Sequence, residues 1–424
     1  MTTRAVNGLQ GLAALIGITF GLLPLAKLWF GANAQTIWTR LLGAMSETTV
    51  HVLAGGTVCL AIVAISFLER RRPPITLPED ALPRRDWLGP VQILCLAGLS
   101  AVGAELLAAY AENTGNVLAL LFALVFFMAL YGAPALLARE LVRRAGWGWP
   151  SLLLLALALG IAQACLIDQS LFSADYIGYE GWAEARQDAF IPMLSISANQ
   201  AWSFIVGHVI FSFGAPIAIA EAWRPHRARE PWLGPVGIVI AVLAYVGTAL
   251  LVAFDPSSRS ASATQFIASA LLVLACILTA WRIGRGARPV AATERERSSI
   301  SPLAVFAIAL VPALALAMDL FAEGWAAFAL NVTVTGAIGA LVWRRARRPG
   351  WTVRHIAAVA LAFLVSRGAL AFTYFPLAGQ VEAPAKYGHN IVMMLIVLIA
   401  GWFALRPGAT ASPAAAGDPD EARP

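Results

Sequence analysis

Charged residues are scarce in this sequence. Only 13% of its 424 residues are Asp, Glu, Lys or Arg, whereas 59% are hydrophobic, and the mean hydropathy is +0.73. A soluble domain usually carries about 25% charged residues, because charge has to cover its surface. The shortage excludes a soluble globular protein of this size and indicates that lipid covers much of the surface.

Cysteine is equally scarce, and no catalytic signature is present. The four cysteines all lie in apolar runs and form no CxxC pair: Cys59, Cys95, Cys165 and Cys276. Such cysteines pack as small hydrophobic residues, so we expect neither disulfides nor a zinc site. The sequence contains no HExxH, GxSxG, P-loop or dinucleotide-binding GxGxxG motif. It therefore favours a non-enzymatic role, and no cofactor is expected.

Basic residues exceed acidic ones and give a formal net charge of +6. They lie in short clusters between apolar runs and do not form the continuous basic face that binds nucleic acid. The pattern excludes a nucleic-acid partner and is typical of membrane proteins whose loops carry the charge. The lipid bilayer is the first expected partner.

Apolar runs of about 20 residues recur along the whole chain, and each is long enough to cross a bilayer as a helix. They do not alternate apolar and polar residues as the strands of an outer-membrane barrel would. Backbone groups in lipid must bond within their own segment, so we predict an all-α, polytopic transmembrane helical bundle of about twelve spans. The predicted spans are 9–27, 47–68, 88–109, 117–138, 150–167, 198–222, 233–253, 264–282, 302–319, 325–343, 354–373 and 390–405.

Linkers rich in arginine alternate with linkers that contain few cations. The rich ones hold Arg70, Arg71, Arg72, Arg84 and Arg85, then Arg139, Arg143 and Arg144, then Arg224, Arg227 and Arg229, then Arg282, Arg285 and Arg288, and finally Arg344, Arg345, Arg347 and Arg348. The poor ones hold Lys27, Arg40, Arg186, Arg259 and Lys386. Twelve spans counted from a cytoplasmic N-terminus place every rich linker in the cytoplasm. We therefore expect both termini inside, in a multi-pass protein of the plasma membrane.

The two ends of the chain carry further signals. The first apolar run, with Ala32-Asn33-Ala34 after it, resembles a cleaved signal peptide, but Pro24 and Lys27 interrupt it and favour an uncleaved first span. We expect residues 1–405 to form the bundle, which the polar linker 285–300 could divide, and residues 406–424 to form a disordered cytoplasmic tail. Residues 87–91 are echoed by 232–236, which indicates either a duplication or two helices that begin with the same Trp and Gly-Pro signals.

Ionisable side chains inside the predicted spans are few and gather toward one side of the membrane. Because they are costly in lipid, they usually face protein or water. In the predicted orientation they lie in the outer half: Glu47, His51, Glu105, Asp168, Asp319 and Arg367. One interpretation is an outward-facing polar cavity for a small molecule or ion, with Arg367 as its main cation. The other is a structural ion pair of Arg367 with Asp319, Asp168 or Glu105.

The predicted sixth span carries Gln200, Ser203 and His208 through the membrane. His208 could relay protons, bind a metal or contact a ligand, or it could bond to a neighbouring helix as a neutral imidazole. No second histidine is placed to complete a metal site, so we expect no metal. Acidic and aromatic residues mix in the outer loop 168–197, which could cover a cavity or lie on the membrane surface, and the second reading is favoured.

A longer pattern resembles a family of uncharacterised multi-pass membrane proteins found in actinobacteria. Its residues are Tyr131-Gly132-Ala133-Pro134, Arg139-Glu140, Arg143-Arg144, Gly148-Trp149-Pro150, Gly160, Gln169-Ser170-Leu171-Phe172, His208, Pro216-Ile217-Ala218, Glu221 and Trp232-Leu233-Gly234. The resemblance implies a membrane bundle and brings no established activity.

A fainter resemblance concerns CAAX-protease and bacteriocin-processing intramembrane peptidases, in which paired glutamates and histidines activate water. Phe204 and His208 have a similar Phe-x3-His spacing, but Gln163-Ala164 stands where the family pattern has two glutamates. Neither residue can act as a general base, so the resemblance implies an inactive relative. The sequence thus favours a transporter-like or small-ligand-binding protein. A degenerate peptidase relative or an accessory membrane subunit is the alternative, and nothing indicates the oligomeric state.

Overall fold

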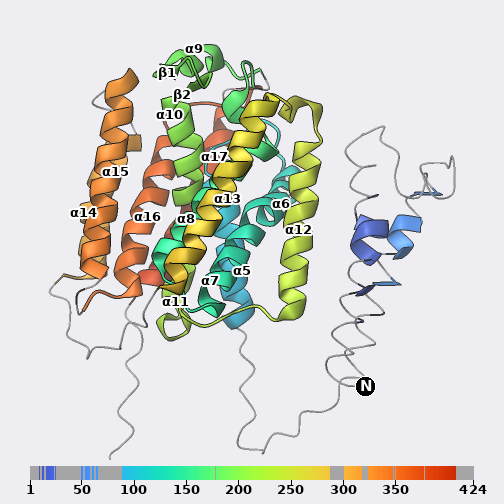
Figure 1. Cartoon of the computed structure of the whole chain (residues 1–424), viewed down its shortest axis with the longest axis horizontal. Helices are drawn as coiled ribbons and strands as arrows, with labels where there is room; N and C mark the ends of the chain where they lie inside the picture. Colours follow the sequence, from blue (N-terminus) through green and yellow to red (C-terminus); the bar gives the residue numbers. More distant parts are fainter. Residues whose placement is uncertain are drawn as a thin grey trace, which may run out of the picture.

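The computed structural model (Figure 1) describes residues 88–286, 300–317, 323–346 and 350–406, apart from residues 177 and 377, together with residue 348 and short stretches between residues 9 and 64. Nearly all regular structure in this part is helical, with one two-stranded hairpin. Nine helices of the described part are long and apolar enough to cross a bilayer. The predicted all-α membrane bundle is therefore confirmed.

Several of these spans combine α-helical and π-helical segments. The first four are α5 (Leu88–Ala101) with η3 (Val102–Leu106); α6 (Val117–Phe127), η4 (Met128–Gly132) and α7 (Ala133–Arg144); α8 (Trp149–Ala162) with η5 (Gln163–Ile167); and α10 (Ala198–Ala201), η7 (Trp202–Val206), η8 (His208–Gly214) and α11 (Ala215–Trp223). The other five are α12 (Pro235–Ala253), α13 (Ala263–Arg285), α15 (Gly324–Ala346), α16 (Val353–Leu370) and α17 (Ala383–Leu405), and the shorter α14 covers Pro302–Ala317.

These helices correspond to ten of the predicted spans, since α14 joins the nine longer ones. The predicted spans 9–27 and 47–68 lie largely outside the described residues. In the described part of 9–27, the structure defines the segment η1 (Ile18–Leu22). Most of the linker 285–300 and nearly all of the tail 406–424 also lie outside them. The twelve-span count thus stays a prediction.

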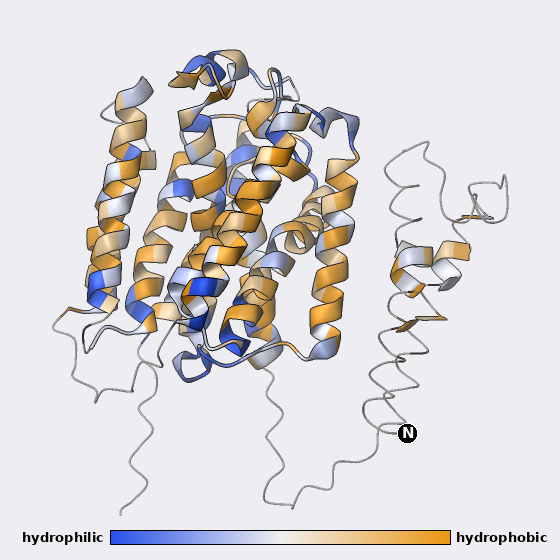
Figure 2. Ribbon diagram, in the orientation of Figure 1, coloured by the Kyte–Doolittle hydropathy of each residue, from blue (hydrophilic) through white to orange (hydrophobic). Residues whose placement is uncertain are grey.

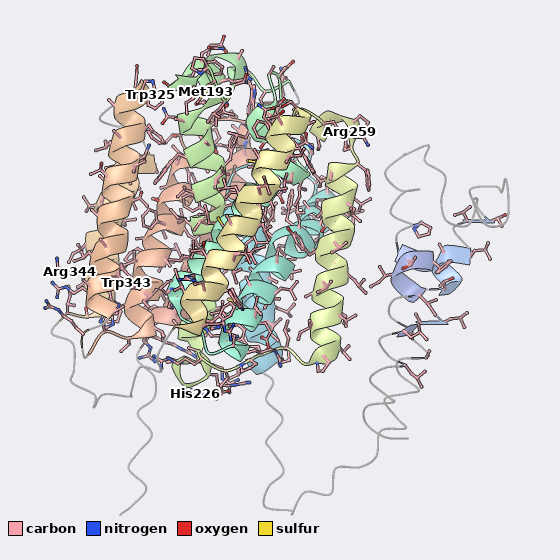
Figure 3. All side chains as sticks on the ribbon, viewed as in Figure 1. Met193, His226, Arg259, Trp325, Trp343 and Arg344 are labelled. Atoms are coloured by element: carbon pink, nitrogen blue, oxygen red, sulfur yellow. The ribbon has the colours of Figure 1, made fainter. Side chains whose placement is uncertain are left out.

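The connecting segments gather at two opposite ends of the bundle. Figure 3 shows His226 and Arg344 at one end and Met193, Arg259 and Trp325 at the other. Hydrophobic residues dominate the helices between these ends (Figure 2). The arginine-rich linkers in the described part therefore share one end, as the alternation predicts, and we retain as a prediction that this end faces the cytoplasm.

The segment 168–197 covers the other end (Figure 1). It contains η6 (Ser170–Phe172), α9 (Trp182–Gln187) and a hairpin of β1 (Phe190–Ile191) and β2 (Ile196–Ser197). The strands are antiparallel, with Phe190 opposite Ser197 and Ile191 opposite Ile196. Short 3-10 turns η9 (Pro225–Arg227) and η10 (Pro256–Ser258) complete the connections.

The bundle is held together by close contacts between helices with small side chains. Helix α16 packs against α11, α14 and α17, and α8 packs against α13. Ala357, Ala358 and Ala362 on α16 are completely buried. Small residues let helix backbones approach each other, which is the main source of packing energy where lipid surrounds the helices.

The structure corrects the predicted environment of two residues. Helix α17 begins at Ala383 and not at 390, so Lys386 and His389 are helical and buried, although the sequence places them in an outer loop. Lys386 donates to the Phe372 carbonyl at 3.1 Å, and His389 Nε2 bonds to the Leu106 carbonyl at 2.7 Å. His355, at the cytoplasmic start of the predicted span 354–373, is buried in the first turn of α16. Each of these three side chains forms a hydrogen bond with a backbone carbonyl or with the backbone at a helix end. These bonds offset the cost of burying a polar group.

Candidate functional site

Four π-helical segments bring polar side chains into the interior of the bundle. Glu105 lies in η3, Tyr131 in η4, Gln163 in η5 and His208 in η8. Segment η8 contacts both η3 and η4, and η5 contacts η7. The π-helix, with its i→i+5 hydrogen bonds, is rare and occurs frequently at functional sites, where it redirects side chains. We call Glu105, Tyr110, Tyr131, His208 and Arg367 the polar cluster.

Glycines permit the close approach of these segments. A Cβ atom on Gly103 in η3 would collide with the backbone carbonyl of Phe211 in η8. A Cβ atom on Gly160, just before η5, would lie 2.7 Å from the Ile205 carbonyl oxygen. Only a residue without a side chain fits at such contacts, so these two glycines allow η3 and α8 to lie against the η7–η8 segment.

Glu105 is held by two tyrosines. The Tyr131 hydroxyl donates to Glu105 Oε1 at 2.6 Å, and the Tyr110 hydroxyl donates to Oε2 at 3.2 Å. Tyr131 is buried, whereas Glu105 keeps part of its surface open. Each carboxylate oxygen can accept a second hydrogen bond, so Glu105 retains capacity for another donor.

Arg367 comes from α16 and reaches the same place. Its Nη2 donates to the carbonyl of Ala104 at 3.1 Å, and its guanidinium lies 4.9 Å from the centroid of the Phe211 ring. Its Nε is buried without a hydrogen-bond partner, and no carboxylate of the described residues forms a direct ion pair with it. Arg367 and Glu105 therefore interact electrostatically without a direct ion pair, and Asp319, the third predicted partner beside Asp168, lies outside the described residues.

His208 stacks on Tyr131, with ring centroids 5.2 Å apart, and its Nδ1 lies 2.8 Å from Ser212 Oγ. Arg367 also acts on His208 electrostatically. Tyr131 therefore lies between His208 and the Glu105 carboxyl group and contacts both. A hydrogen-bonded neutral imidazole in contact with a Tyr–Glu pair can serve either to bind a ligand or to keep the helices in register.

Asp168 follows η5 beside the cluster. Gln163 Nε2 donates to its Oδ2 at 3.1 Å, and the Ser170 amide donates to its Oδ1 at 2.9 Å. Asp168 interacts electrostatically with Glu105 and Tyr131. The structure thus places the predicted residues Glu105, Asp168, His208 and Arg367 in one region of the bundle.

Aromatic side chains of the segment 168–197 lie next to this region. Tyr176 stacks on Trp182 at 5.1 Å, and Trp182 stacks on Phe204 of η7 at 5.8 Å. Burial raises the pKa of Tyr179 to about 12, and the charge of Glu105 adds to this effect. Tyr179 therefore stays protonated near Glu105, and the loop contacts the end of the bundle that contains the polar cluster.

Of the four other predicted site residues, only Gln200 lies in the part of the chain that the structure describes. Gln200 is buried in α10, where its amide N–H bonds to Ser197 Oγ and its side-chain oxygen has no partner. Glu47, His51 and Asp319 lie outside the described residues. No group of three His, Cys, Asp or Glu side chains in the described part could hold a metal ion.

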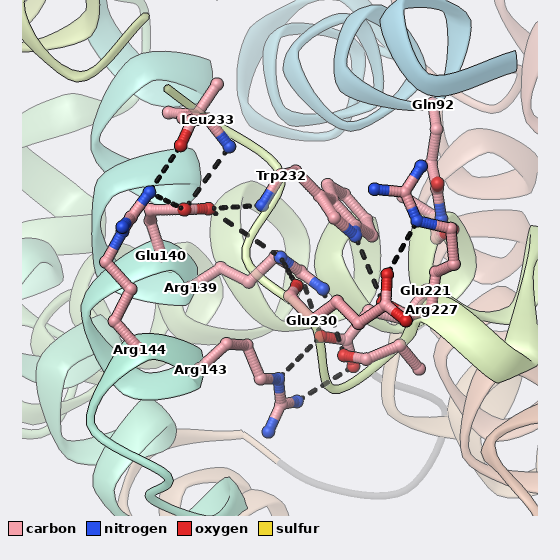
Figure 4. Close-up of polar contacts among 12 residues, drawn as sticks. Gln92, Arg139, Glu140, Arg143, Arg144, Glu221, Arg227, Glu230, Trp232 and Leu233 are labelled. Atoms are coloured by element: carbon pink, nitrogen blue, oxygen red, sulfur yellow. Dashed lines mark hydrogen bonds and ion pairs between the residues drawn. The ribbon is translucent and has the colours of Figure 1, made fainter. Parts of the chain in front are cut away.

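A second polar arrangement lies at the arginine-rich end of the bundle, where α7 and α11 end, and Figure 4 shows its contacts. Arg139 and Arg143 of α7 both bind Glu221 of α11, with Nε to Oε1 distances of 2.9 Å and 2.8 Å. Arg139 and Glu221 are 0% and 1% exposed. The sequence treats these arginines as linker cations, but the structure buries them as helix-to-helix ion pairs. We call Arg139, Glu140, Arg143, Arg144 and Glu221 the arginine network.

The arginine network also holds the loop that leads into α12. The Arg139 guanidinium lies 3.3 Å from the centroid of the Trp232 ring and donates to the carbonyls of Ala228 and Glu230. Glu140 accepts from the backbone amides of Trp232 and Leu233 at 2.9 Å and 3.2 Å, and Arg144 pairs with Glu140 at 2.9 Å. The charges and polar groups compensate each other, which indicates a structural role.

The sequence did not indicate Tyr131, Tyr110 or the residues of the arginine network as members of a polar site. Tyr131, Arg139, Glu140, Arg143, Arg144, Glu221 and Trp232 all belong to the pattern that carries the family resemblance. That pattern was the available signal, although it does not say which residues meet.

The fold and these interior polar groups define an all-α, multi-pass membrane protein. The chain belongs to an uncharacterized membrane protein family, whose model matches residues 94–415. The match begins after the two N-terminal predicted spans and includes the polar cluster and the arginine network. Comparisons with curated proteins and with solved structures give no match.

Proposed function

We propose that the polar cluster binds a small polar solute or ion that reaches it from the end covered by the segment 168–197, as in a transporter or a small-ligand-binding membrane protein. The main support for this proposal is the environment of Arg367. A guanidinium inside a membrane bundle normally has acidic partners or an anionic ligand, because each unpaired donor is costly there. The buried Nε of Arg367 has no partner.

Two further observations support a ligand. Glu105, Asp168, His208 and Arg367 all keep part of their surface open although they come from different interior segments. Four of the neighbouring spans also give up regular α-helical bonding in this region. Departures from ideal geometry that cluster around polar side chains are more common at functional sites than in purely structural packing.

No specific observation favours the peptidase alternative. Gln163 bonds to Asp168 instead of activating water, and His208 bonds to Ser212, with no hydrogen bond to a carboxylate among the described residues. An accessory membrane subunit would bind no solute, so the same experiment separates it from the proposed function.

Ligand-dependent thermal stabilisation of the purified full-length protein tests the proposal. The panel is sodium, chloride, inorganic phosphate and small organic acids, compared between the wild type and Arg367→Gln. Glutamine keeps a donor for the Ala104 carbonyl but removes the charge. A ligand present at about 100 times its Kd should stabilise the wild type by about 2.7 kcal/mol, and this gain should disappear in Arg367→Gln.

Arg285→Gln is the matched control, because Arg285 is an exposed arginine at the end of α13, where it lies over the Trp281 ring. This variant should respond to the ligand like the wild type. A ligand that stabilises wild type and Arg367→Gln equally would remove Arg367 from the binding site, and a panel without any stabilising ligand would favour the accessory role.

A further inference from the structure

We propose that the ligand is a small organic carboxylate and that it binds together with one proton, which is taken up by Glu105. This inference rests on the proposed function, since it names the ligand of the same site. It follows from the donors left on Arg367 and from the charges that surround it.

The free donors of Arg367 fit a carboxylate. Nη2 already bonds to the Ala104 carbonyl, and the Phe211 ring covers one face of the guanidinium. Nε has no partner, and Nη1 forms no hydrogen bond with a residue in the described part. Parallel N–H donors that match the two oxygens of a carboxylate come from Nη2 together with either Nε or Nη1, so the second N–H of Nη2 and one of the two unbonded nitrogens would bind the ligand side by side.

The charges nearby oppose the binding of an anion as long as Glu105 is ionised. Glu105 interacts electrostatically with Arg367, and Asp168 adds a second negative charge. An anion that enters this arrangement brings a third carboxylate to one guanidinium, in a region where water screens charges weakly. Protonation of Glu105 removes one of the competing charges and makes Arg367 available to the ligand.

Glu105 can accept this proton without losing its position. Tyr131 and Tyr110 approach its two oxygens, and a hydroxyl group can either donate to a carboxylate or accept from a carboxylic acid. The protonated side chain can therefore keep a hydrogen bond to one tyrosine and accept from the other. The exchange of a proton does not require Glu105 to move.

The other titratable and charged groups around Glu105 come from every element packed on it. They are Tyr110 after η3, Tyr131 in η4, Asp168 after η5, Tyr176 and Tyr179 in the loop, His208 in η8, Arg367 in α16, Tyr374 after α16, and His389 in α17, whose Nε2 bonds to the Leu106 carbonyl. The tyrosines stay protonated near neutral pH, because the pKa of a tyrosine is normally about 10. Asp168, His208 and His389 are thus the groups whose titration has to be separated from that of Glu105.

Binding of pyruvate and benzoate to the purified full-length protein tests the proposal, because both remain ionised from about pH 8 to about pH 5.5. Wild-type affinity should rise on acidification, by about tenfold per pH unit where one proton is coupled to binding. In Glu105→Gln, which imitates the protonated acid, affinity should equal the acidic wild-type value at every pH. Asp168→Asn, His208→Gln and His389→Gln should keep the pH dependence.

Calorimetric titration of the wild type in two buffers with different ionisation enthalpies supplies a measurement that needs no variant. It should show uptake of about one proton per carboxylate bound near neutral pH. Binding without proton uptake, a pH dependence that persists in Glu105→Gln, or failure of both carboxylates to bind at either pH would overturn the inference. If another ligand bound and its binding required Arg367, only this inference would be wrong and the proposed function would stand. If ligand binding did not require Arg367, this inference and the proposed function would both be wrong.

Discussion

Replacement of Glu221 by alanine should lower the free energy of unfolding by about 3–5 kcal/mol, because it leaves two buried guanidinium groups without their shared carboxylate. Arg139 and Arg143 both bind Glu221, and Arg143 forms a two-pronged contact through Nε and Nη2, each at 2.8 Å. Unfolding of the purified protein in mixed micelles with increasing denaturing detergent measures the change.

The matched control is Glu230→Ala. Glu230 also pairs with an arginine at 2.8 Å, but its side chain is 54% exposed. An exposed pair of this kind contributes about 0–1 kcal/mol, so this variant should unfold almost like the wild type. Equal effects of the two substitutions would mean that the arginine network does not hold α7 and α11 together.

Replacement of Gly103 by alanine should destabilise the protein about as much as Glu221→Ala, although it adds only one methyl group. The added Cβ would collide with the Phe211 backbone carbonyl and with the Leu364 side chain at 2.9 Å, and a backbone atom cannot move aside as a flexible side chain can. Overpacking of this kind costs about 1–3 kcal/mol or more and would push η3 away from η8. We expect a loss of stability of about 3 kcal/mol and loss of ligand binding, because Glu105 lies two residues further on.

Gly98→Ala on the same span is the control. A Cβ at Gly98 in α5 would meet no atom within 4 Å. Alanine is favoured over glycine inside a helix by about 1 kcal/mol, so this variant should be as stable as the wild type or more so. If Gly103→Ala behaved like Gly98→Ala in the same detergent titration, the close contact between η3 and η8 would be refuted.

The sequence was sufficient to predict the helices, because an apolar run long enough to cross a bilayer has few alternatives to a helix. It could not predict where those helices become π-helical. Apolar character determines that a segment lies in the membrane, but the register of its backbone hydrogen bonds depends on contacts such as that of Gly103 with Phe211. The interior position of Glu105 and Tyr131 is therefore a property of packing and not of the local pattern.

The partners of charged residues were equally beyond prediction. The contact of Arg143 with Glu221 joins residues that are 78 positions apart, and the bond from Arg367 to Ala104 joins residues 263 positions apart. The sequence identifies Arg367 and Glu105 as unusual because they are ionisable residues in apolar runs. Arg139 lies just beyond an apolar run, so the sequence treats it as an ordinary linker cation. Only the tertiary structure shows that α11 and the 228–232 loop surround it.

Above all, we propose that the polar cluster is reached from outside the cell, through the end covered by the segment 168–197. Labelling of a His208→Cys variant in intact cells tests it most directly, in a background where the four native cysteines are replaced by serine or alanine. A membrane-impermeant thiol reagent added outside should modify this variant. An Arg229→Cys variant, with its thiol at an exposed position of the arginine-rich end, should react only after the cells are opened. The reverse pattern, with Arg229→Cys labelled from outside and His208→Cys protected, would contradict both the orientation and the site.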